Sequence, residues 1–127
     1  RQMCIRDRLP SPSPEALKTE QLVEVPLVES VRNYAKLAQA AGLSGVVCSA
    51  HEAADIASVT GPDFLRVTPG IRPAGAAVGD QARVATPGSA AGMGSSAIVV
   101  GRPITKADDP VAAYHAIRDD WNAGRKA

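Results

Sequence analysis

The sequence predicts an α/β fold in which short parallel strands alternate with Ala-rich helices. Its 127 residues suffice for one domain and are too few for two. Hydrophobic residues make up 45% of the chain and aromatic residues only 3%, so the core must be aliphatic, as is typical of buried parallel strands. Strand and helix patterns alternate regularly along the chain, which favours a parallel sheet with crossover helices.

The first helix is predicted over residues 28–41, because apolar side chains recur there at helical spacing and Gly42 follows as a C-terminal cap. Gly45–Cys48 is then predicted to form a buried strand. Ser49, with Glu52 three residues later, has the pattern of a capping box, which predicts the start of a second helix.

The Gly61-Pro62 pair ends this second helix, and Phe64–Thr68 is predicted as the next strand. Residues 69–81 form a loop rich in Gly, Pro and Ala. Loops of this length in compact domains are usually functional. The Thr86-Pro87 pair predicts the start of a short helix.

The last predicted strand is Ala97–Val100, which leads into the turn Gly101-Arg102-Pro103. Asp108 or Asp109, followed by Pro110, is expected to start a final helix that runs to about residue 121.

Two segments carry the candidate chemistry, and each follows a predicted strand directly. They are Thr68–Pro73, continuing to Gly79–Gln81, and Val99–Ile104. In a (β/α)8 barrel the carboxyl ends of the strands form the active-site face, and the loops after strands 7 and 8 commonly hold a phosphate. Gly101 would let backbone approach an anion closely, and Arg102 offers a planar fork of donors that fits phosphate oxygens.

Other polar residues near these loops admit simpler interpretations. Arg72, in a Gly/Pro loop, is either solvated or in contact with a ligand, and its position favours the ligand. Gln81 could reach both a phosphate and a second polar group. Cys48 is expected to be an inert buried thiol and His51 a solvated residue in the first turn of a helix.

These segments together resemble bacterial orotidine 5'-phosphate decarboxylase from about Leu22 to the C-terminus. The matching motifs are Val46–Ser49, Val67–Pro73, Gly79–Arg83 and Val100–Ile104. The resemblance implies part of a (β/α)8 TIM barrel, roughly strands 6–8 with their helices plus the helix before. By matching motifs it also implies four substrate-binding residues, Arg72, Gln81, Gly101 and Arg102.

The resemblance further implies decarboxylation of orotidine 5'-phosphate to UMP in de novo pyrimidine biosynthesis, without metal or cofactor, by a homodimer. The catalytic Asp-x-Lys-x-x-Asp array of that family is absent, because no Asp in this sequence has a Lys two residues later. The chain by itself is therefore expected to be inactive. The alternatives are a non-catalytic phosphate-binding half barrel, or part of a related phosphosugar decarboxylase or synthase.

Residues 1–11 are expected to be a non-native or truncated N-terminus, and residues 12–127 the C-terminal part of the barrel. Arg1–Arg8 is too charged for a buried strand, and Leu9-Pro10-Ser11 lies where the family has a Leu-Thr-Ser motif.

The composition argues against several classes of partner. Lys and Arg number 14 against 13 Asp and Glu, so there is no electrostatic signature of nucleic acid or membrane binding. Two cysteines make neither a disulfide framework nor a metal cluster. We therefore expect a cytoplasmic location and the substrate nucleotide as the partner.

Overall fold

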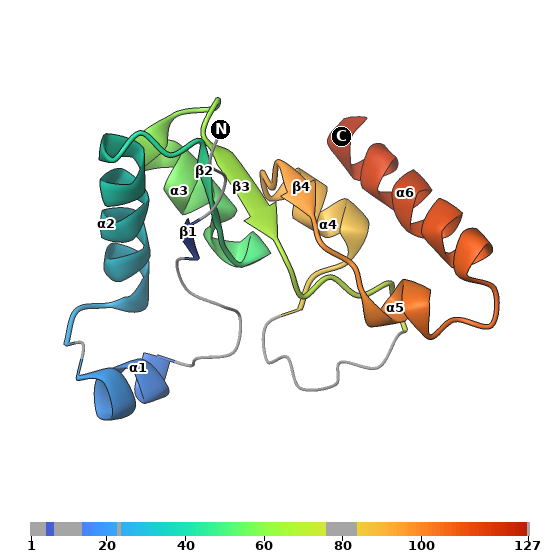
Figure 1. The fold of residues 1–127 in the computed structure, drawn as a ribbon, viewed down its shortest axis with the longest axis horizontal. Helices are drawn as coiled ribbons and strands as arrows, with labels where there is room; N and C mark the ends of the chain where they lie inside the picture. The colour runs from blue at the N-terminus through green and yellow to red at the C-terminus, as the bar shows by residue number, and fades with distance from the viewer. Residues whose placement is uncertain (1–4, 7–13, 23, 76–83, 127) are drawn as a thin grey trace.

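The computed structural model describes residues 5–6, 14–22, 24–75 and 84–126 (Figure 1). Its sheet has four strands, all parallel, in the order β1-β2-β3-β4. The strands are β1 (Ile5–Arg6), β2 (Gly45–Val47), β3 (Leu65–Thr68) and β4 (Ala97–Ile98). The predicted α/β class with a parallel sheet is confirmed.

The helices alternate with the strands along the chain as predicted, and the structure adds α1 before the first predicted helix and α5 between β4 and the last helix. The helices are α1 (Pro14–Gln21), α2 (Leu27–Ala40), the 3-10 helix η1 (Ala50–Glu52), α3 (Ala53–Thr60), α4 (Pro87–Gly92), α5 (Arg102–Thr105) and α6 (Pro110–Lys126). None of the helices in the described ranges combines the length and the apolar character that crossing a membrane requires.

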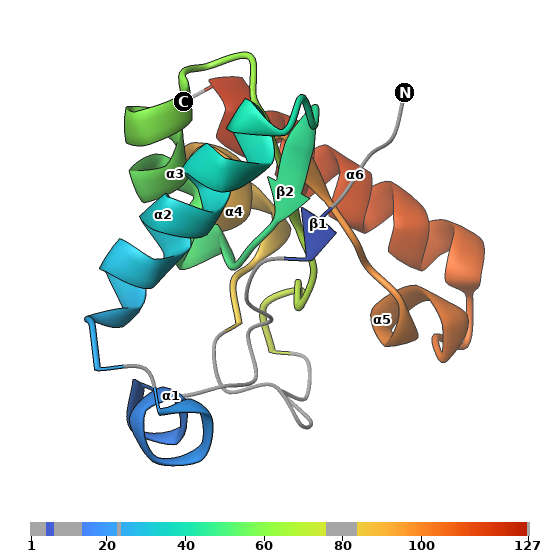
Figure 2. The ribbon, with the colours of Figure 1, turned by 60° about the vertical axis from the view of Figure 1, so that its left-hand side comes forward.

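The three predicted strands are confirmed as β2, β3 and β4, and the structure adds the two-residue strand β1. Ile5 pairs with Val46 and Arg6 with Val47, which places β1 beside β2 (Figure 2), and β3 pairs with β2 on its other side. The strand lies in a stretch that we expected to be too charged for a buried strand. It can pair there because pairing at the edge of a sheet uses backbone groups and does not require buried side chains.

Local caps fix the ends of the helices around β2. Gly42 has a φ of +80°, which favours glycine, and Leu43 N donates to Ala38 O at 3.1 Å, which closes the end of α2. Ser49 N donates to Glu52 Oε2 at 3.2 Å in the predicted capping box. Both predicted caps are confirmed.

Two apolar clusters form the core on the helix-facing side of the sheet. The first joins α2 and α3 to β2 and to the residue before β3, and its members are Val31, Ala35, Ala38, Val46, Cys48, Ile56 and Phe64. The second joins β4 to α4 and α6, and contains Ala50, Ile71 and Ala90 with Ala85, Met93, Ile98, Val100 and Trp121 packed against them. Cys48 is fully buried, as expected.

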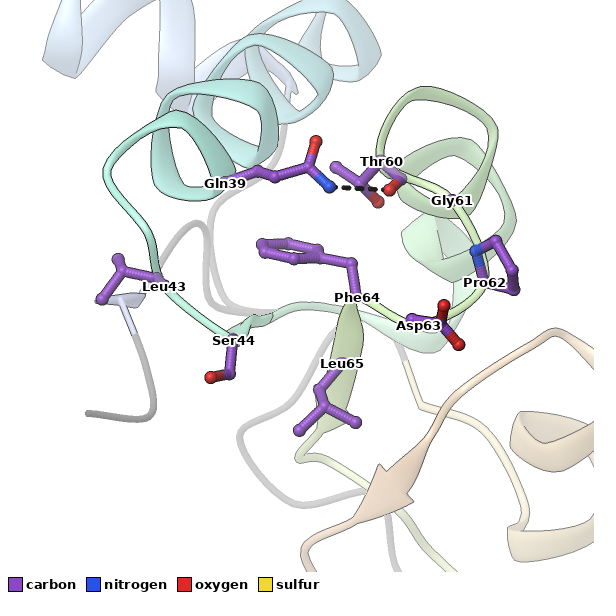
Figure 3. Close-up of a pocket in the computed structure, with 9 residues that line it drawn as sticks. All are labelled: Gln39, Leu43, Ser44, Thr60, Gly61, Pro62, Asp63, Phe64 and Leu65. Atoms are coloured by element: carbon purple, nitrogen blue, oxygen red, sulfur yellow. Dashed lines mark hydrogen bonds between the residues drawn. The ribbon is translucent and has the colours of Figure 1, made fainter. Parts of the chain in front are cut away.

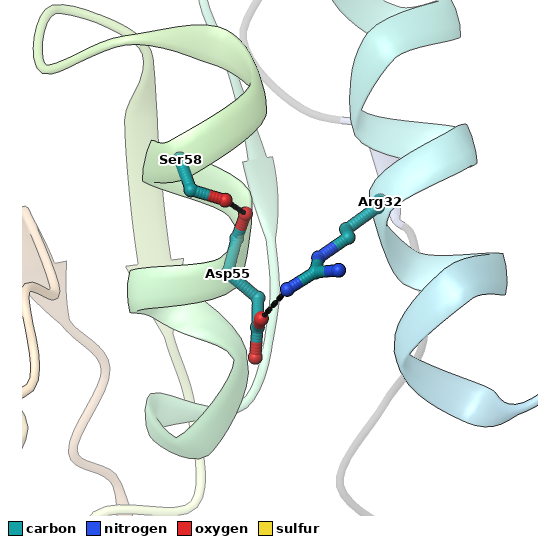
Figure 4. Close-up of polar contacts among 3 residues, drawn as sticks. All are labelled: Arg32, Asp55 and Ser58. Carbon is teal, nitrogen blue, oxygen red and sulfur yellow. Dashed lines mark hydrogen bonds and ion pairs between the residues drawn. The ribbon is translucent and has the colours of Figure 1, made fainter.

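Polar contacts supplement this packing between α2 and α3. Arg32 Nη2 pairs with Asp55 Oδ1, while Ser58 Oγ donates to Asp55 O at 2.6 Å (Figure 4). The side chains of Arg32 and Asp55 are 42% and 32% exposed, so water screens the ion pair and its stabilisation is at most about 1 kcal/mol.

A second helix contact, between α4 and α6, depends on two glycines. A Cβ on Gly124 would lie 2.1 Å from Gly88 O, so the backbones of the two helices are in direct contact at this point. Gly88 N also donates to Asp120 Oδ2 at 2.9 Å. The short helix α4 is thereby held against α6, beside β4 (Figure 1).

Candidate functional site

The two segments predicted to carry the chemistry begin side by side at the carboxyl edge of the sheet. Val67 pairs with Ala97 and Thr68 with Ile98 in parallel register. In the residue after β4, Val99 N donates to Thr68 O at 2.9 Å. The loops that follow β3 and β4 therefore leave neighbouring strands in the same direction.

Backbone contacts fix the start of the loop after β3. Gly70 has a φ of +77°, a conformation that other residues rarely adopt. Ile71 then forms an isolated parallel bridge with Ala85, and Arg72 N donates to Ala85 O at 3.0 Å. The backbone of Arg72 is thus held in place before the loop continues.

Arg72 is 8% exposed, so the alternative in which it is solvated is wrong. Its Nη1 donates to Ile71 O at 3.3 Å, near the long end of hydrogen-bond geometry. Gln81, the other residue predicted on this loop, lies outside the described residues, as do its neighbours from residue 76 to 83.

The segment after β4 forms a short helix, α5, where the sequence suggested a turn. Ile104 N and Thr105 N donate to Gly101 O at 2.9 and 3.0 Å, which makes Gly101 the N-cap and Arg102 the first helical residue. Proline is favoured in the first turn of a helix, and Pro103 stands there. Sequence reasoning missed α5 because Gly-Arg-Pro is also typical of a turn.

Gly101 and Arg102 are both exposed at the carboxyl edge of the sheet. A Cβ on Gly101 would meet no described protein atom within 4 Å, so this position borders open space. A (β/α)8 barrel commonly binds phosphate with the loops after its last two strands and the N-terminus of a short extra helix. The position of α5 directly after β4 matches that arrangement.

A cavity of about 460 Å³ adjoins both loops. Its lining combines the loop after β3, the start of α4, α5 and one face of α6: Pro73, Ala74, Thr86, Pro87, Pro103, Ala113, Ala116, Ile117 and Asp120. Pro73 directly follows Arg72, and Pro103 directly follows Arg102. The backbone segments that carry the two predicted arginines therefore border one cavity, although neither arginine lines it and its charged lining residue is Asp120.

A larger groove, of about 570 Å³, lies at the opposite end of the sheet, among residues that precede β2 and β3 (Figure 3). Gln39 Nε2 donates there to Thr60 O at 2.7 Å, and Asp63 is exposed at its rim. Neither of the two candidate loops contributes to its lining. It lies at the other end of the sheet from both loops, so its volume does not make it the phosphate site.

The lysines lie away from the strands. Lys18 is on α1 and Lys36 on α2, whereas Lys106 follows α5 and Lys126 ends α6. Within the part of the chain that the structure describes, no strand carries a lysine, and no group of three or more His, Cys, Asp or Glu residues could hold a metal ion. His51 is exposed at the start of η1, as predicted.

The fold and the site define an α/β protein whose parallel sheet places two candidate anion-binding loops at its carboxyl edge. The chain belongs to the orotidine 5'-phosphate decarboxylase / HUMPS family, whose model matches residues 5–117. The match begins at residue 5 and not near Leu22, where the resemblance was expected to start.

Relatives within this family are similar along almost the whole chain. The orotidine 5'-phosphate decarboxylase of Cutibacterium acnes is 92% identical over 120 residues, which are 94% of this chain and 51% of the relative. That of Streptococcus uberis is 58% identical over 116 residues, 91% of this chain and 50% of the relative.

A solved structure supports the same assignment. The crystal structure of orotidine 5'-phosphate decarboxylase from Lactobacillus acidophilus has a TM-score of 0.78 and 46% identity, over 94% of this chain and 49% of that one. The chain spans about half the length of the relatives it matches.

Proposed function

We propose that this chain is the phosphate-binding, C-terminal part of an orotidine 5'-phosphate decarboxylase, with β2, β3 and β4 as barrel strands 6, 7 and 8. The complete protein would convert orotidine 5'-phosphate to UMP in the cytoplasm, as a homodimer and without a cofactor. The observation that carries the proposal is the shared cavity beside the loops of Arg72 and Arg102.

Each proposed binding residue has a physical role at this edge. Arg102, an exposed residue, would bind the phosphate through its guanidinium. Gly101 would let the phosphate approach the backbone closely. Arg72, whose Nη1 makes a long hydrogen bond to Ile71 O, would exchange that carbonyl oxygen for a phosphate oxygen. Gln81 would close over the ligand from the far end of the loop.

Phosphate binding of this kind serves a reaction that occurs elsewhere on the substrate. The phosphate is remote from the carbon that loses the carboxylate, so its binding energy can be used to orient the ring and to close the loop. Closure excludes water from a site where charge develops.

The chemical step needs a group that this chain does not supply. No Asp-x-Lys-x-x-Asp array occurs in the sequence, so the chain would bind the nucleotide without donating the proton that replaces the carboxylate. The Pro-Gly-Ile-Arg-Pro and Gly-Asp-Gln motifs favour orotidylate over the phosphosugars of related enzymes.

The test uses a joined protein, in which the first half of the Cutibacterium acnes relative replaces residues 1–11 and residues 12–127 follow. Arg102→Ala should weaken UMP binding and leave uridine binding unchanged, because only UMP carries a phosphate. A charge-assisted hydrogen bond is worth about 1.5–3 kcal/mol, which corresponds to about 10- to 150-fold in affinity.

The matched control is Arg118→Ala, an exposed arginine on α6 that pairs with Asp119. Isothermal titration calorimetry with UMP and with uridine measures both variants. If Arg102→Ala weakened the binding of UMP and of uridine equally, Arg102 would not contact the phosphate. The same conclusion would follow if the Arg118→Ala control weakened UMP binding as much as Arg102→Ala does.

A further inference from the structure

The first turn of α4 is capped in part by a residue of a distant helix. Its local cap is Thr86, whose Oγ1 accepts from Ser89 N at 3.2 Å. Pro87, the first helical residue, has no N–H group to satisfy. The N–H that remains is that of Gly88, and it donates to Asp120 Oδ2 of α6 at 2.9 Å. Asp120 therefore completes a cap that the residues next to α4 leave open.

The contact between Asp120 and α4 depends on a close approach of the two helices. Asp120 and Gly124 are one helical turn apart, so they lie on the same face of α6. A Cβ on Gly88 would lie 2.7 Å from Asp120 Oδ1, so a larger residue at this position would displace the carboxylate. The backbone contact between Gly88 and Gly124 and the Asp120 carboxylate together hold α4 against α6.

The residue before the N-cap of α4 holds the backbone of Arg72. This residue, Ala85, forms a parallel bridge with Ile71, and its carbonyl oxygen accepts from Arg72 N at 3.0 Å. Asp120 and Pro73, the residue after Arg72, also line the same cavity. A shift of α4 along α6 would therefore move Ala85, and with it the backbone that carries the Arg72 side chain.

We propose that Asp120 is a positioning residue for phosphate binding, which fixes α4 through Gly88 N and thereby orients Arg72 through Ala85. The inference rests on the proposed function, in which Arg72 binds a phosphate oxygen. Asp120 acts through Arg72 and does not itself contact the substrate. Its role needs a hydrogen-bond acceptor and not a negative charge, because its partner is a backbone N–H.

Binding of UMP and of uridine to the joined protein, measured by isothermal titration calorimetry, tests the proposal. Asp120→Ala should weaken UMP binding about fivefold, the size of the loss of one helix N-cap, and leave uridine binding unchanged. Asp120→Asn keeps an oxygen that can accept from Gly88 N, so it should restore UMP binding. The matched control is Asp119→Ala, at the neighbouring exposed acid of α6, which pairs with Arg118 and should change neither affinity.

A pair of double variants tests whether Asp120 acts through Arg72. Arg72→Ala alone should weaken UMP binding, and the addition of Asp120→Ala should have no further effect, because the side chain that Asp120 positions is already gone. In an Arg102→Ala protein, by contrast, Asp120→Ala should still weaken UMP binding about fivefold.

Circular dichroism establishes whether each variant is folded. Unchanged UMP binding by Asp120→Ala overturns the proposal, and so does an Asp120→Asn protein that binds UMP as weakly as Asp120→Ala. An effect of Asp120→Ala that is undiminished in the Arg72→Ala protein also overturns it, as does a loss of folding in Asp120→Ala, which would make the contact purely structural. Failure of the proposed function is a different result: the joined protein without substitutions would bind UMP no more tightly than uridine, and this inference would fall with it.

Discussion

Three arginines on or after β3 and β4 occupy three different environments. Arg66 is buried on β3, with Nε donating to Gly94 O at 2.8 Å and Nη1 to Phe64 O at 2.6 Å. Arg72 is also buried, and its Nη1 makes a long hydrogen bond to Ile71 O, whereas Arg102 is exposed at the start of α5. Arg66 binds carbonyl oxygens of the protein, and Arg72 and Arg102 are the two arginines that we propose bind the ligand.

The sequence motifs point to Arg72 and Arg102 and not to Arg66. The signal that could have found it is an arginine inside an otherwise apolar strand, at a position whose register partner Val46 faces the helices. The hydrogen-bond partners of Arg66 could not be predicted from the sequence, because they are backbone carbonyls that the turns before β3 and β4 bring together.

Replacing Arg66 by Met should lower the free energy of unfolding of the joined protein by about 1–3 kcal/mol, because buried carbonyl oxygens would lose their donors. Arg118→Met, at an exposed position, should cost at most about 1 kcal/mol. Urea unfolding measures both variants. Equal stability of the two would show that the carbonyl contacts of Arg66 contribute little.

Most of the elements follow from local patterns. The helix α2, the capped start of η1 and α3, and the Thr86-Pro87 start of α4 lie where they were predicted, because each has an apolar face or a capping signal. Asp109 Oδ1 accepts from Val111 N and Ala112 N at 3.0 and 2.9 Å, which confirms one of the two predicted starts of α6.

The elements that were missed lack such signals or carry conflicting ones. α1 has little apolar content, β1 has two residues, and α5 begins with a Gly-Arg-Pro motif that is typical of a turn. The last strand is shorter than predicted, since only Ala97–Ile98 forms regular strand pairs. α6 extends beyond residue 121 because no glycine cap or proline stops it there.

The glycine contact between α4 and α6 gives a prediction at this scale. Gly124→Ala should destabilise the joined protein by about 1–3 kcal/mol, because the added methyl group would overlap Gly88 O unless the helices separate. Gly92→Ala, on α4 with no described atom within 4 Å of its Cβ, should instead add up to about 1 kcal/mol.

Thermal unfolding distinguishes the two glycine variants by the sign of the change in Tm. If Gly124→Ala raised Tm as Gly92→Ala is expected to do, the close backbone contact between α4 and α6 would not exist in solution.

At the scale of the whole molecule, helices cover one face of the parallel sheet, and the candidate phosphate loops leave its carboxyl edge. The class of fold and the positions of both loops could be predicted, because strand ends and loop composition are local properties of the sequence. The adjacency of Pro73 and Pro103 in one cavity depends on how β3, β4 and α5 pack, so only the structure reveals it.

The central claim is that this chain binds the nucleotide but lacks the group that protonates it, and one assay tests it directly. UMP formation from orotidine 5'-phosphate is measured for the 127-residue chain and for the joined protein, which regains the Asp-x-Lys-x-x-Asp array. We expect no UMP above the buffer control from the chain and clear UMP formation from the joined protein. UMP formation by the chain alone, or a folded joined protein that forms none, would contradict the account.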